Sequence, residues 1–520
     1  MGNGRNLPAG WVTTSLGEMF DFQGGGTPSK KVPDYWDGKI PWASVKDIKQ
    51  KYLSETIDSI TDSGLKNSAA NIANPGSLLV LTRIEPGKAA IPKVPIAVNQ
   101  DCKIASPKGS VDPEWAYYFF IANEREFLNR SSGTTVLGIR LSELKSVPVH
   151  LPPLNEQHRI VTKIEELFSE LDKGVDSLKT ARAQLKTYRQ SLLKAAFEGR
   201  LTEQWRKDNA EQFESAEALL DRIRGEREVR YQEQLADWEA AVDDWGKQGK
   251  PGKKPRKPDA PLFLEGEYQA TEKTQRPRKW CRVKVGDVFS VYVGATPSRK
   301  KPEFWLGEIN WVSSGEVAFC EISETKETIS EIGLENTSTR MHPPGTVILA
   351  MIGEGKTRGQ AAILRTTASH NQNTAAIRVS ESGMDPYFLY FYFLYRYEAN
   401  RRLGSGNNQK ALNKKRVMEM DFPLPPVKEQ KQIIDIIVSA LTQIDELSKT
   451  LFGQLERAQS LRQSILKRAF EGKLVPQDPN DEPASELLER IRQEQDEKPA
   501  PVRRKRRKQE ATADLFDGND

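Results

Sequence analysis

The feature that most constrains the fold of this chain is an internal duplication. Trp11-Val-Thr-Thr-Ser-Leu-Gly-Glu-Met-Phe20 returns in the second half of the chain as Trp280-Cys-Arg-Val-Lys-Val-Gly-Asp-Val-Phe289. Ser191-Leu-Leu-Lys-Ala-Ala-Phe-Glu-Gly-Arg-Leu201 returns as Ser464-Ile-Leu-Lys-Arg-Ala-Phe-Glu-Gly-Lys-Leu474, with eight of eleven positions identical. Because the repeats keep their order along the chain, they predict two copies of one structural unit rather than one large core.

Within each copy, a mixed domain of strands and helices precedes a Pro-Pro pair and a long helical segment. Short apolar runs such as residues 77–81 and 346–350 are typical of strands. We expect a short helix at residues 113–127 and at 386–402, because each begins with a proline that suits the first helical turn. The predicted boundaries are 1–153 for the first mixed domain, 154–225 for the first spacer helix region, 226–279 for a charged helical extension and Pro/Lys-rich linker, 280–426 for the second mixed domain, 427–475 for the second spacer helix region, and 476–520 for a C-terminal helix and disordered tail.

The long helical segments carry an apolar residue at every seventh position. These seam residues are Ile164, Leu171, Leu178, Leu185 and Leu192 in the first copy and, at the equivalent positions of the second, Ile437, Ile444, Leu451, Ala458 and Ile465. Leu167, Phe168, Val175, Ala181 and Tyr188 are expected to fill the turns between the seam residues of the first copy. A helix of this kind would be roughly 58 Å long at 1.5 Å per residue, too long to bury its seam against one mixed domain. The seam therefore predicts that the two segments pair as a coiled coil.

Composition excludes several classes of protein. Lys and Arg exceed Asp and Glu by 77 − 72 = 5, which permits nucleic-acid binding without requiring it. Three cysteines without CxxC spacing predict neither a disulfide framework nor a zinc site. No apolar run approaches the roughly 18 residues of a membrane span, and the first residues lack the pattern of a secretory signal. We therefore expect a cytoplasmic protein.

Two polar segments are expected to lie outside the folded repeats. Residues 247–258 form a linker that is too rich in proline and glycine to fold. The tail from Pro499 contains a basic run at residues 503–508 and then turns acidic, a pattern typical of disorder.

Two similar units that pair through their helices should adopt pseudo-twofold symmetry, because like surfaces pair with each other. The predicted fold class is α+β, with two mixed α/β domains joined by two long antiparallel helices that form a coiled coil. In a DNA reader, such helices would set the distance between two half-sites while each mixed domain reads one. The domains differ in places, for example at residues 133–138 and 406–411, which predicts an asymmetric target.

Three groups of residues resemble the specificity subunits of type I restriction-modification systems. They are Gly24-Gly-Gly-Thr-Pro-Ser29 with the Tyr35-Trp36 and Ile40-Pro-Trp42 that follow, the Leu-Pro-Pro-Leu-x-Glu-Gln run of residues 151–157, and the Ala-Phe-Glu-Gly-x-Leu run of residues 196–201. The resemblance covers both halves of the chain and leaves out the linker and tail. It implies that each mixed domain is a target-recognition domain for one half of a bipartite, asymmetric DNA site, with the helices as spacer.

The resemblance also implies partners and cofactors. A subunit of this family is not an enzyme; it recruits two adenine-N6 methyltransferase subunits, and with two ATP-driven restriction subunits the complex translocates and cuts double-stranded DNA. S-adenosylmethionine, ATP and Mg would then be used by the partner subunits, with none bound by this chain. We expect Glu156, Gln157, Glu429 and Gln430, at the start of the helices, to form part of the surface that docks the methyltransferase subunits.

Candidate DNA contacts are the polar and basic residues of three loops that recur in both copies. Phosphate contacts need Lys, Arg or hydroxyl groups, and base readout needs side chains such as Arg, Asn and Gln. The first pair of loops contributes Thr27, Ser29, Lys30 and Lys31 with Thr296, Ser298, Arg299, Lys300 and Lys301; the second Arg83 and Lys88 with Lys356 and Arg358; and the third Arg130, Ser132 and Arg140 with Arg401, Arg402, Asn407, Asn408, Gln409 and Lys410. The alternative for each residue is a solvated surface position, whereas Trp42 and Trp311 are expected to pack in the interior.

Three catalytic interpretations are weaker. Residues 350–357 satisfy a loose phosphate-loop pattern, but the segment that follows is predicted to be a strand, whereas a phosphate loop must open a helix. The glycines at 24–26 resemble a methyl-donor loop only faintly, and their second copy keeps one of them, so turn glycines are the better interpretation. The four histidines, His150, His158, His342 and His370, show no pairing suited to a metal or to acid–base chemistry.

Two other functions remain as alternatives to the DNA-reading subunit. One is a bifunctional relative that itself methylates or cuts DNA, although two repeats leave no room for an added catalytic domain. The other is a coiled-coil assembly scaffold without a role at nucleic acid.

Overall fold

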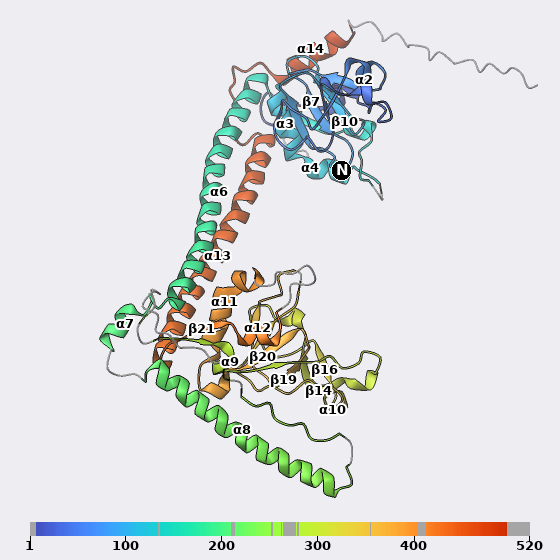
Figure 1. Ribbon diagram of the computed structural model, residues 1–520. Helices are drawn as coiled ribbons and strands as arrows, with labels where there is room; N and C mark the ends of the chain where they lie inside the picture. Colours follow the sequence, from blue (N-terminus) through green and yellow to red (C-terminus); the bar gives the residue numbers. More distant parts are fainter. Residues whose placement is uncertain are drawn as a thin grey trace, which may run out of the picture. The chain divides into compact units, whose positions relative to one another are not determined.

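The computed structural model describes residues 7–133, 136–209, 214–250, 253–261, 263, 277, 280–353, 355–402 and 412–496. It divides into unit 1, residues 1–179 and 452–520, and unit 2, residues 180–451. Two helices of 44 residues each, α6 (Leu154–Phe197) and α13 (Val427–Phe470), continue from one unit into the other (Figure 1). Each unit therefore contains one mixed domain and part of each long helix.

The mixed domain of unit 1 is built on two sheets and a two-stranded ribbon. The strand orders are β2-β10-β7-β8-β4, β5-β3-β9-β6 and β1-β11. The elements are β1 (Val12–Ser15), α1 (Leu16–Met19), β2 (Phe20–Gly24), η1 (Pro33–Tyr35), β3 (Trp36–Ala43), β4 (Tyr52–Leu53), β5 (Asp58–Ile60), α2 (Asp62–Lys66), β6 (Asn71–Ala73), β7 (Leu78–Leu81), β8 (Ala89–Pro92), β9 (Ile96–Val98), β10 (Cys102–Pro107), α3 (Pro113–Ala122), α4 (Glu124–Asn129), α5 (Leu141–Lys145) and β11 (Pro148–Leu151). The helix predicted at 113–127 is thus two helices that meet at Asn123.

The mixed domain of unit 2 repeats this arrangement. Its strand orders are β13-β20-β17-β18-β15, β16-β14-β19 and β12-β21. The elements are β12 (Cys281–Lys284), α9 (Val285–Val288), β13 (Ser290–Val293), η2 (Pro302–Phe304), β14 (Trp305–Val312), η3 (Ser314–Glu316), β15 (Cys320–Ile322), β16 (Glu327–Ile329), α10 (Glu331–Glu335), β17 (Thr346–Ala350), β18 (Ala361–Leu364), β19 (Ala368–His370), β20 (Thr374–Arg378), η4 (Val379–Ser382), α11 (Pro386–Arg402), α12 (Lys414–Met418) and β21 (Asp421–Leu424).

The central strand of each large sheet is buried on both faces. In β7, Leu78 and Val80 belong to the core that includes α3, whereas Leu79 and Leu81 belong to a second core. The same alternation divides β17 between two cores of unit 2. Because side chains alternate across a strand, continuous apolar sequence is what a strand covered on both faces requires.

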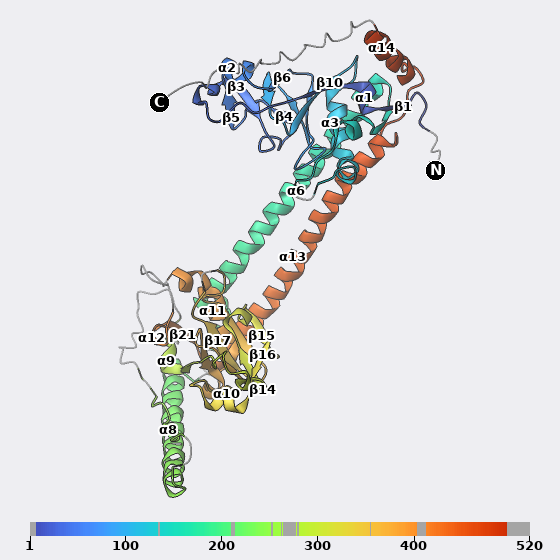
Figure 2. The ribbon, with the colours of Figure 1, turned by 90° about the vertical axis from the view of Figure 1, so that its right-hand side faces the viewer.

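The two long helices pack antiparallel in both units. In unit 1, Arg462 of α13 forms an ion pair with Asp172 of α6, and in unit 2 Arg189 of α6 lies 3.5 Å from Asp445 of α13. Asp172 and Arg189 are separated by 189 − 172 = 17 residues along α6, and Asp445 and Arg462 by 462 − 445 = 17 residues along α13. Figures 1 and 2 both draw α6 and α13 side by side within each unit. The helices therefore keep one antiparallel register, and the predicted fold class is confirmed.

Burial of the predicted seam depends on position along the helix. The seam residues near the mixed domains are buried, and those farther away are half-buried. Buried are Ile164, Leu192, Ile437, Ile444, Ala458 and Ile465, and half-buried are Leu171, Leu178, Leu185 and Leu451. Tyr188, expected between seam positions, is instead 55% exposed.

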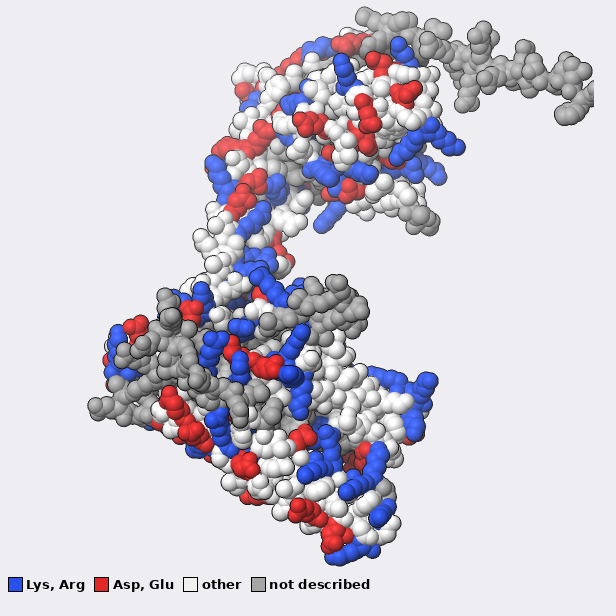
Figure 3. All heavy atoms as spheres, in the orientation of Figure 1, with Lys and Arg blue, Asp and Glu red and all other residues white. Residues whose placement is uncertain are grey.

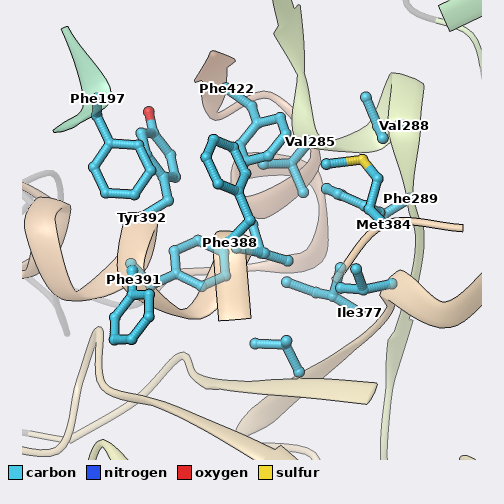
Figure 4. Packing of buried hydrophobic residues seen from close by; sticks show 14 of the residues in the cluster. Phe197, Val285, Val288, Phe289, Ile377, Met384, Phe388, Phe391, Tyr392 and Phe422 are labelled. Atoms are coloured by element: carbon cyan, nitrogen blue, oxygen red, sulfur yellow. The ribbon is translucent and has the colours of Figure 1, made fainter. Parts of the chain in front are cut away.

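The C-terminal end of each long helix packs against a mixed domain, that of α6 in unit 2 and that of α13 in unit 1. Phe197, at the end of α6, packs on Phe388 and Tyr392 of α11 with ring centroids 5.4 and 5.3 Å apart (Figure 4). Phe470, at the end of α13, packs on Trp115 of α3 at 5.6 Å. Gly199 and Gly472 follow with positive φ of 75° and 67°, and this left-handed conformation ends the helix. The repeated Ala-Phe-Glu-Gly run therefore anchors and terminates each helix.

A helix farther along the chain completes the mixed domain against which each long helix ends; after α6 this is α8 (Ala216–Lys247), which the short helix α7 (Glu203–Asp208) precedes. In unit 1, α14 (Ala484–Asp496) comes from the second half of the chain and contributes Leu487 and Ile491 to the core of the first mixed domain. In unit 2, α8 comes from the first half and contributes Leu219 and Ile223 to the core of the second mixed domain. The two halves of the chain thus exchange their closing helices.

The structure contradicts the prediction that the Glu-Gln pairs are exposed docking residues. Glu156, Gln157, Glu429 and Gln430 are at most 1% exposed. Trp11 donates from Nε1 to Glu156 Oε2 over 3.0 Å, and Trp280 donates to Glu429 Oε2 over 2.9 Å. Burial raises the pKa of Glu156. These carboxylates instead tie the start of each long helix to the beginning of its mixed domain.

The linker predicted to be unfolded is held in part. Trp238 of α8 donates from Nε1 to the carbonyl oxygen of Pro255 over 3.0 Å. Lys253 donates to the carbonyl oxygen of Glu335 over 3.1 Å, and Arg256 to that of Ser338 over 3.2 Å. Residues 253–261 form neither helix nor strand, yet they lie against α8 and the second mixed domain, because backbone carbonyls receive their basic side chains.

Candidate nucleic-acid interface

The first candidate loop is held by two tryptophans in each mixed domain. We call residues 27–31 and 296–301 the TP loops. Trp42 donates from Nε1 to the carbonyl oxygen of Gly26 over 3.0 Å, and Trp36 donates to that of Ser29 over 3.3 Å. The two indoles meet edge to face with centroids 5.2 Å apart. The loop is therefore fixed by a rigid aromatic base.

The second TP loop has the same support. Trp311 donates to the carbonyl oxygen of Ala295 over 3.0 Å, and Trp305 donates to that of Ser298 over 3.2 Å; their centroids are 5.1 Å apart. Trp42 and Trp311 are 5% and 2% exposed, so their predicted packing role is confirmed. The sequence pattern Thr-Pro-Ser followed by two tryptophans thus encodes one loop structure twice.

The TP loops present their polar side chains to solvent. Thr27, Ser29, Lys30, Lys31, Ser298, Arg299, Lys300 and Lys301 are exposed, and Thr296 is half-buried. Arg299 stacks over Trp305 at 3.8 Å and forms an ion pair with Glu327, whose pKa it lowers. Figure 3 shows Lys and Arg side chains gathered at the end of unit 2 that carries β14, β16 and α10. A surface on which basic side chains gather attracts a polyanion such as DNA.

The second and third candidate loops of the first mixed domain lie together. Ile84 N–H donates to the carbonyl oxygen of Leu137 over 2.8 Å, and Ile139 N–H donates to that of Thr82 over 2.9 Å. Arg83 is exposed and pairs with Asp101 at 3.1 Å. Ser132 and Arg140 are also exposed. The backbone bonds therefore join two loops that are far apart in sequence into one surface.

Two residues of this surface are less suited to DNA binding than the sequence indicated. Arg130 is half-buried and donates from Nε to Glu126 Oε1 over 2.7 Å. Lys88 is half-buried and lies 2.5 Å from Glu85. Both side chains are therefore less accessible to a phosphate than the exposed Arg83, although Arg83 is also paired with a carboxylate.

The second mixed domain joins its loops through two arginines. Arg358 donates to the carbonyl oxygen of Arg401 over 2.8 Å, and Arg401 donates to that of Gly355 over 2.9 Å. Lys356 and Arg402 are exposed, whereas Arg358 and Arg401 are half-buried. The predicted Asn407, Asn408, Gln409 and Lys410 lie outside the described residues.

A turn that the sequence analysis missed connects these loops. We call residues 99–101 and 371–373 the NQ turns, with sequences Asn-Gln-Asp and Asn-Gln-Asn. In unit 1, Gln100 Oε1 accepts the hydroxyl hydrogen of Thr27 over 2.5 Å, and Asp101 pairs with Arg83. In unit 2, Gln372 accepts from Thr296, and the Asn373 carbonyl oxygen accepts from Met351 N–H over 2.8 Å. The recurrence of Asn-Gln between short strands in both copies was the signal available.

The structure shows what surrounds the loop and the histidines considered for catalysis. Residues 350–357 lead into the strand β18 and not into a helix, so the loop lacks the helix N-terminus that a phosphate loop needs. Among the described residues there is no group of three His, Cys, Asp or Glu side chains that could hold a metal ion. His342 and His370 do approach each other, with ring centroids 4.9 Å apart, a pairing that the sequence analysis did not predict. In the described part of the chain no helix is both long and apolar enough to cross a bilayer.

Comparison with known proteins identifies the family. Residues 8–180 and 277–457 match the family described as type I restriction modification DNA specificity domain. The match covers both mixed domains and most of both long helices. The chain belongs to this family.

Three relatives give the extent of the similarity. The chain is 33% identical over 161 residues to the specificity subunit of type I restriction enzyme MjaIX of Methanocaldococcus jannaschii, which spans 30% of this chain and 37% of the relative. It is 29% identical to the EcoR124I/EcoR124II specificity subunit of Escherichia coli, spanning 35% of this chain and 47% of that one. It is 21% identical over 508 residues to the EcoDI specificity subunit of Escherichia coli, spanning 94% and 96%. The alignments to the first two relatives thus span less than half of their length.

Two solved structures share the fold. One, from a study of assembly and conformational transition of the type I restriction-modification system, has a TM-score of 0.62 at 17% identity and covers 90% of this chain and 100% of its own. The other is the HsdS subunit of Thermoanaerobacter tengcongensis, with a TM-score of 0.50 at 17% identity, covering 91% and 99%.

Proposed function

We propose that this chain is the DNA-reading subunit of a type I restriction-modification complex, in which each mixed domain reads one half of a bipartite, asymmetric site. The observation that carries this proposal is the repeated surface: in both domains a TP loop and an NQ turn bond to each other and present exposed hydroxyl, basic and amide groups. These are the groups that contact phosphates and base edges. Two copies of one recognition surface suit two half-sites.

The proposed role of the long helices is to set the spacing between the half-sites. The constant antiparallel register, carried by Asp172 with Arg462 and Asp445 with Arg189, supports a spacer of defined length. Because the seam fixes the register by an apolar residue at every seventh position, length can change only in steps that keep this pattern.

We further propose that the helices dock two methyltransferase subunits and that the complex includes two restriction subunits in the cytoplasm. Large apolar side chains remain exposed on the helices at Tyr188, Val438, Leu447, Phe452 and Leu461, each between 43% and 55% exposed. Apolar surface of this kind favours contact with a partner protein. S-adenosylmethionine, ATP and Mg would be bound by those partners, and this chain would contribute no catalytic residue.

A salt titration separates this function from that of a scaffold. For a DNA reader, the affinity of the full chain for a duplex should fall steeply with salt, because each phosphate neutralised by Lys or Arg releases counterions. Replacing Lys30, Lys31, Lys300 and Lys301 by alanine should make the fall of log affinity with log salt less steep, because fewer phosphates are neutralised. A chain whose binding is absent or unaffected by salt would support the scaffold. Methylation by the chain without partners would support the bifunctional enzyme.

A further inference from the structure

The NQ turns carry a glutamine that the proposed function leaves unassigned. Gln100 and Gln372 are exposed, and each holds the hydroxyl hydrogen of a TP-loop threonine on its Oε1. No hydrogen-bond partner of either Nε2 amide is found among the described residues. Each exposed side chain thus has its oxygen bonded and an amide group without an acceptor among the described residues.

The backbone beneath each glutamine is held by a buried asparagine. Asn99 is 5% exposed, and its Oδ1 accepts the N–H groups of Asp101 and Cys102 over 3.0 and 3.1 Å. Asn371 is 6% exposed, and its Oδ1 accepts the N–H of Asn373 over 3.1 Å. A side chain that accepts from its own turn fixes the turn's shape. Each glutamine therefore projects from a preformed support.

A glycine allows the TP loop to approach this turn. A Cβ on Gly25 would lie 2.1 Å from the carbonyl oxygen of Asn99, and one on Gly294 would lie 1.9 Å from that of His370. Both distances are far below van der Waals contact, so only glycine fits. The glycine that survives in the second copy of the Gly-rich run is thus the one that brings threonine and glutamine together.

The threonine–glutamine pair is identical in the two domains, although the residues around it differ. The neighbouring TP-loop residue is Lys30 in one domain and Arg299 in the other. A contact kept in both domains suits a feature that both half-sites share, whereas divergent residues suit the bases that differ. The feature common to every half-site is the phosphodiester backbone.

We propose that Gln100 and Gln372 donate from Nε2 to DNA phosphate oxygens at equivalent positions of the two half-sites. They fix the register of each domain on the duplex and do not read bases. Thr27 and Thr296 are positioning residues that hold the amide with its donors outward. This inference rests on the proposed function, because it requires that the mixed domains bind DNA.

The test compares Gln100→Leu with Gln100→Glu in the full chain. Glutamate can still accept from Thr27, but it offers a negative oxygen in place of the donor. Affinity is measured by fluorescence anisotropy for a duplex with the methylation motif of the wild-type complex and for a scrambled duplex of equal length. Gln232→Leu and Gln232→Glu are the controls, because Gln232 is an exposed glutamine on α8 bonded to Glu228. The melting temperature of each variant, compared with that of the wild type, checks that the variant is folded.

We expect Gln100→Leu to weaken binding to both duplexes by about tenfold, the size of one hydrogen bond to a charged group. Gln100→Glu should weaken both further, the Gln232 variants should bind as wild type does, and adding Thr27→Val to Gln100→Leu should cause no further loss. The salt slope should stay unchanged in Gln100→Leu, because no cation is removed.

Three results would overturn the inference alone: unchanged affinity in both Gln100 variants, a loss confined to the motif duplex, or an altered methylation motif, which would make Gln100 a base reader. If the wild-type chain itself shows no salt-dependent binding, the proposed function fails and the inference with it.

Discussion

In the second mixed domain two histidines occupy the core where the first domain has alanine and valine. His342 pairs with Ala368 at the start of β19, as Ala73 pairs with Ile96 at the start of β9, and His370 ends β19 as Val98 ends β9. His370 Nδ1 lies 2.8 Å from Thr374 Oγ1, and Arg378 donates from Nε to His342 Nδ1 over 3.2 Å.

The surfaces of the two domains also differ, at the TP loop. The second domain stacks Arg299 on Trp305 and pairs it with Glu327, at positions where the first has Lys30, Trp36 and Asp58. The order of the five-stranded sheet and the threonine–glutamine pair remain the same. The strand order of the domain therefore tolerates changes in its core and its outer loops, while the hydrogen bond between the TP-loop threonine and the NQ-turn glutamine is kept.

The largest expected effect comes from exchanging the recognition surface of one domain. Replacing residues 294–409 by the equivalent segment of another family member should change one half-site completely and leave the other as it was, because the surfaces belong to separate domains. Methylation sequencing reads both halves. A change in both half-sites would show that the two domains are not independent readers.

A heptad deletion tests the spacer that both domains share. Deleting residues 175–181 together with 453–459 removes segments that oppose each other in the register set by Asp172 with Arg462 and Arg189 with Asp445. The helices shorten by roughly 10 Å at 1.5 Å per residue, so the gap between half-sites should shorten with unchanged bases on either side. Altered bases would contradict the spacer role, and deleting one segment alone should disrupt assembly.

The histidine pair should make the second domain sensitive to acid. Burial lowers the pKa of His342 to about 2 and of His370 to about 4, from an ordinary value of 6.5. The unfolded chain therefore takes up protons first as the pH falls, and stability present above pH 6.5 is lost below it, by roughly 1.4 kcal/mol per pH unit for each imidazole.

The double variant His342→Ala with His370→Val, which copies the first domain, provides the control. Thermal unfolding of the full chain should shift down between pH 6.5 and 4.5 in the wild type and by clearly less in this variant. Equal shifts would show that the histidines are not the groups that titrate.

The smallest effect is expected at Arg299. Arg299→Lys removes the planar stack on Trp305 and the two-pronged pair with Glu327 but keeps the charge. Binding to target DNA should weaken by about threefold, a fraction of a cation–π contact, with an unchanged salt slope. Lys30→Arg is the reciprocal variant. A loss as large as that expected for Gln100→Leu would indicate that Arg299 contacts a base.

The sequence predicted the parts of the fold that depend on local pattern. Repeats set the two-part plan, heptads set the pairing of the helices, and prolines set the starts of α3 and α11. It did not predict which domain α8 and α14 complete, because their similarity at residues 219–224 and 487–492 shows equivalence but not placement.

The errors at the site have a physical cause as well. Glu156 and Glu429 were expected at the surface because carboxylates are rarely buried unless paired, and their partners, the indoles of Trp11 and Trp280, lie 145 and 149 residues away. The NQ turns were missed because the bond from Thr27 to Gln100 joins residues 73 apart, and that from Thr296 to Gln372 joins residues 76 apart. Such partners become visible only when the strands between them are placed.

The most direct test is methylation sequencing of DNA from cells that contain the wild-type chain and methyltransferase partners. The account predicts one asymmetric motif made of two specified blocks separated by a fixed number of unspecified bases, and loss of that motif without this chain. A continuous motif, or methylation that persists when the chain is removed, would contradict it.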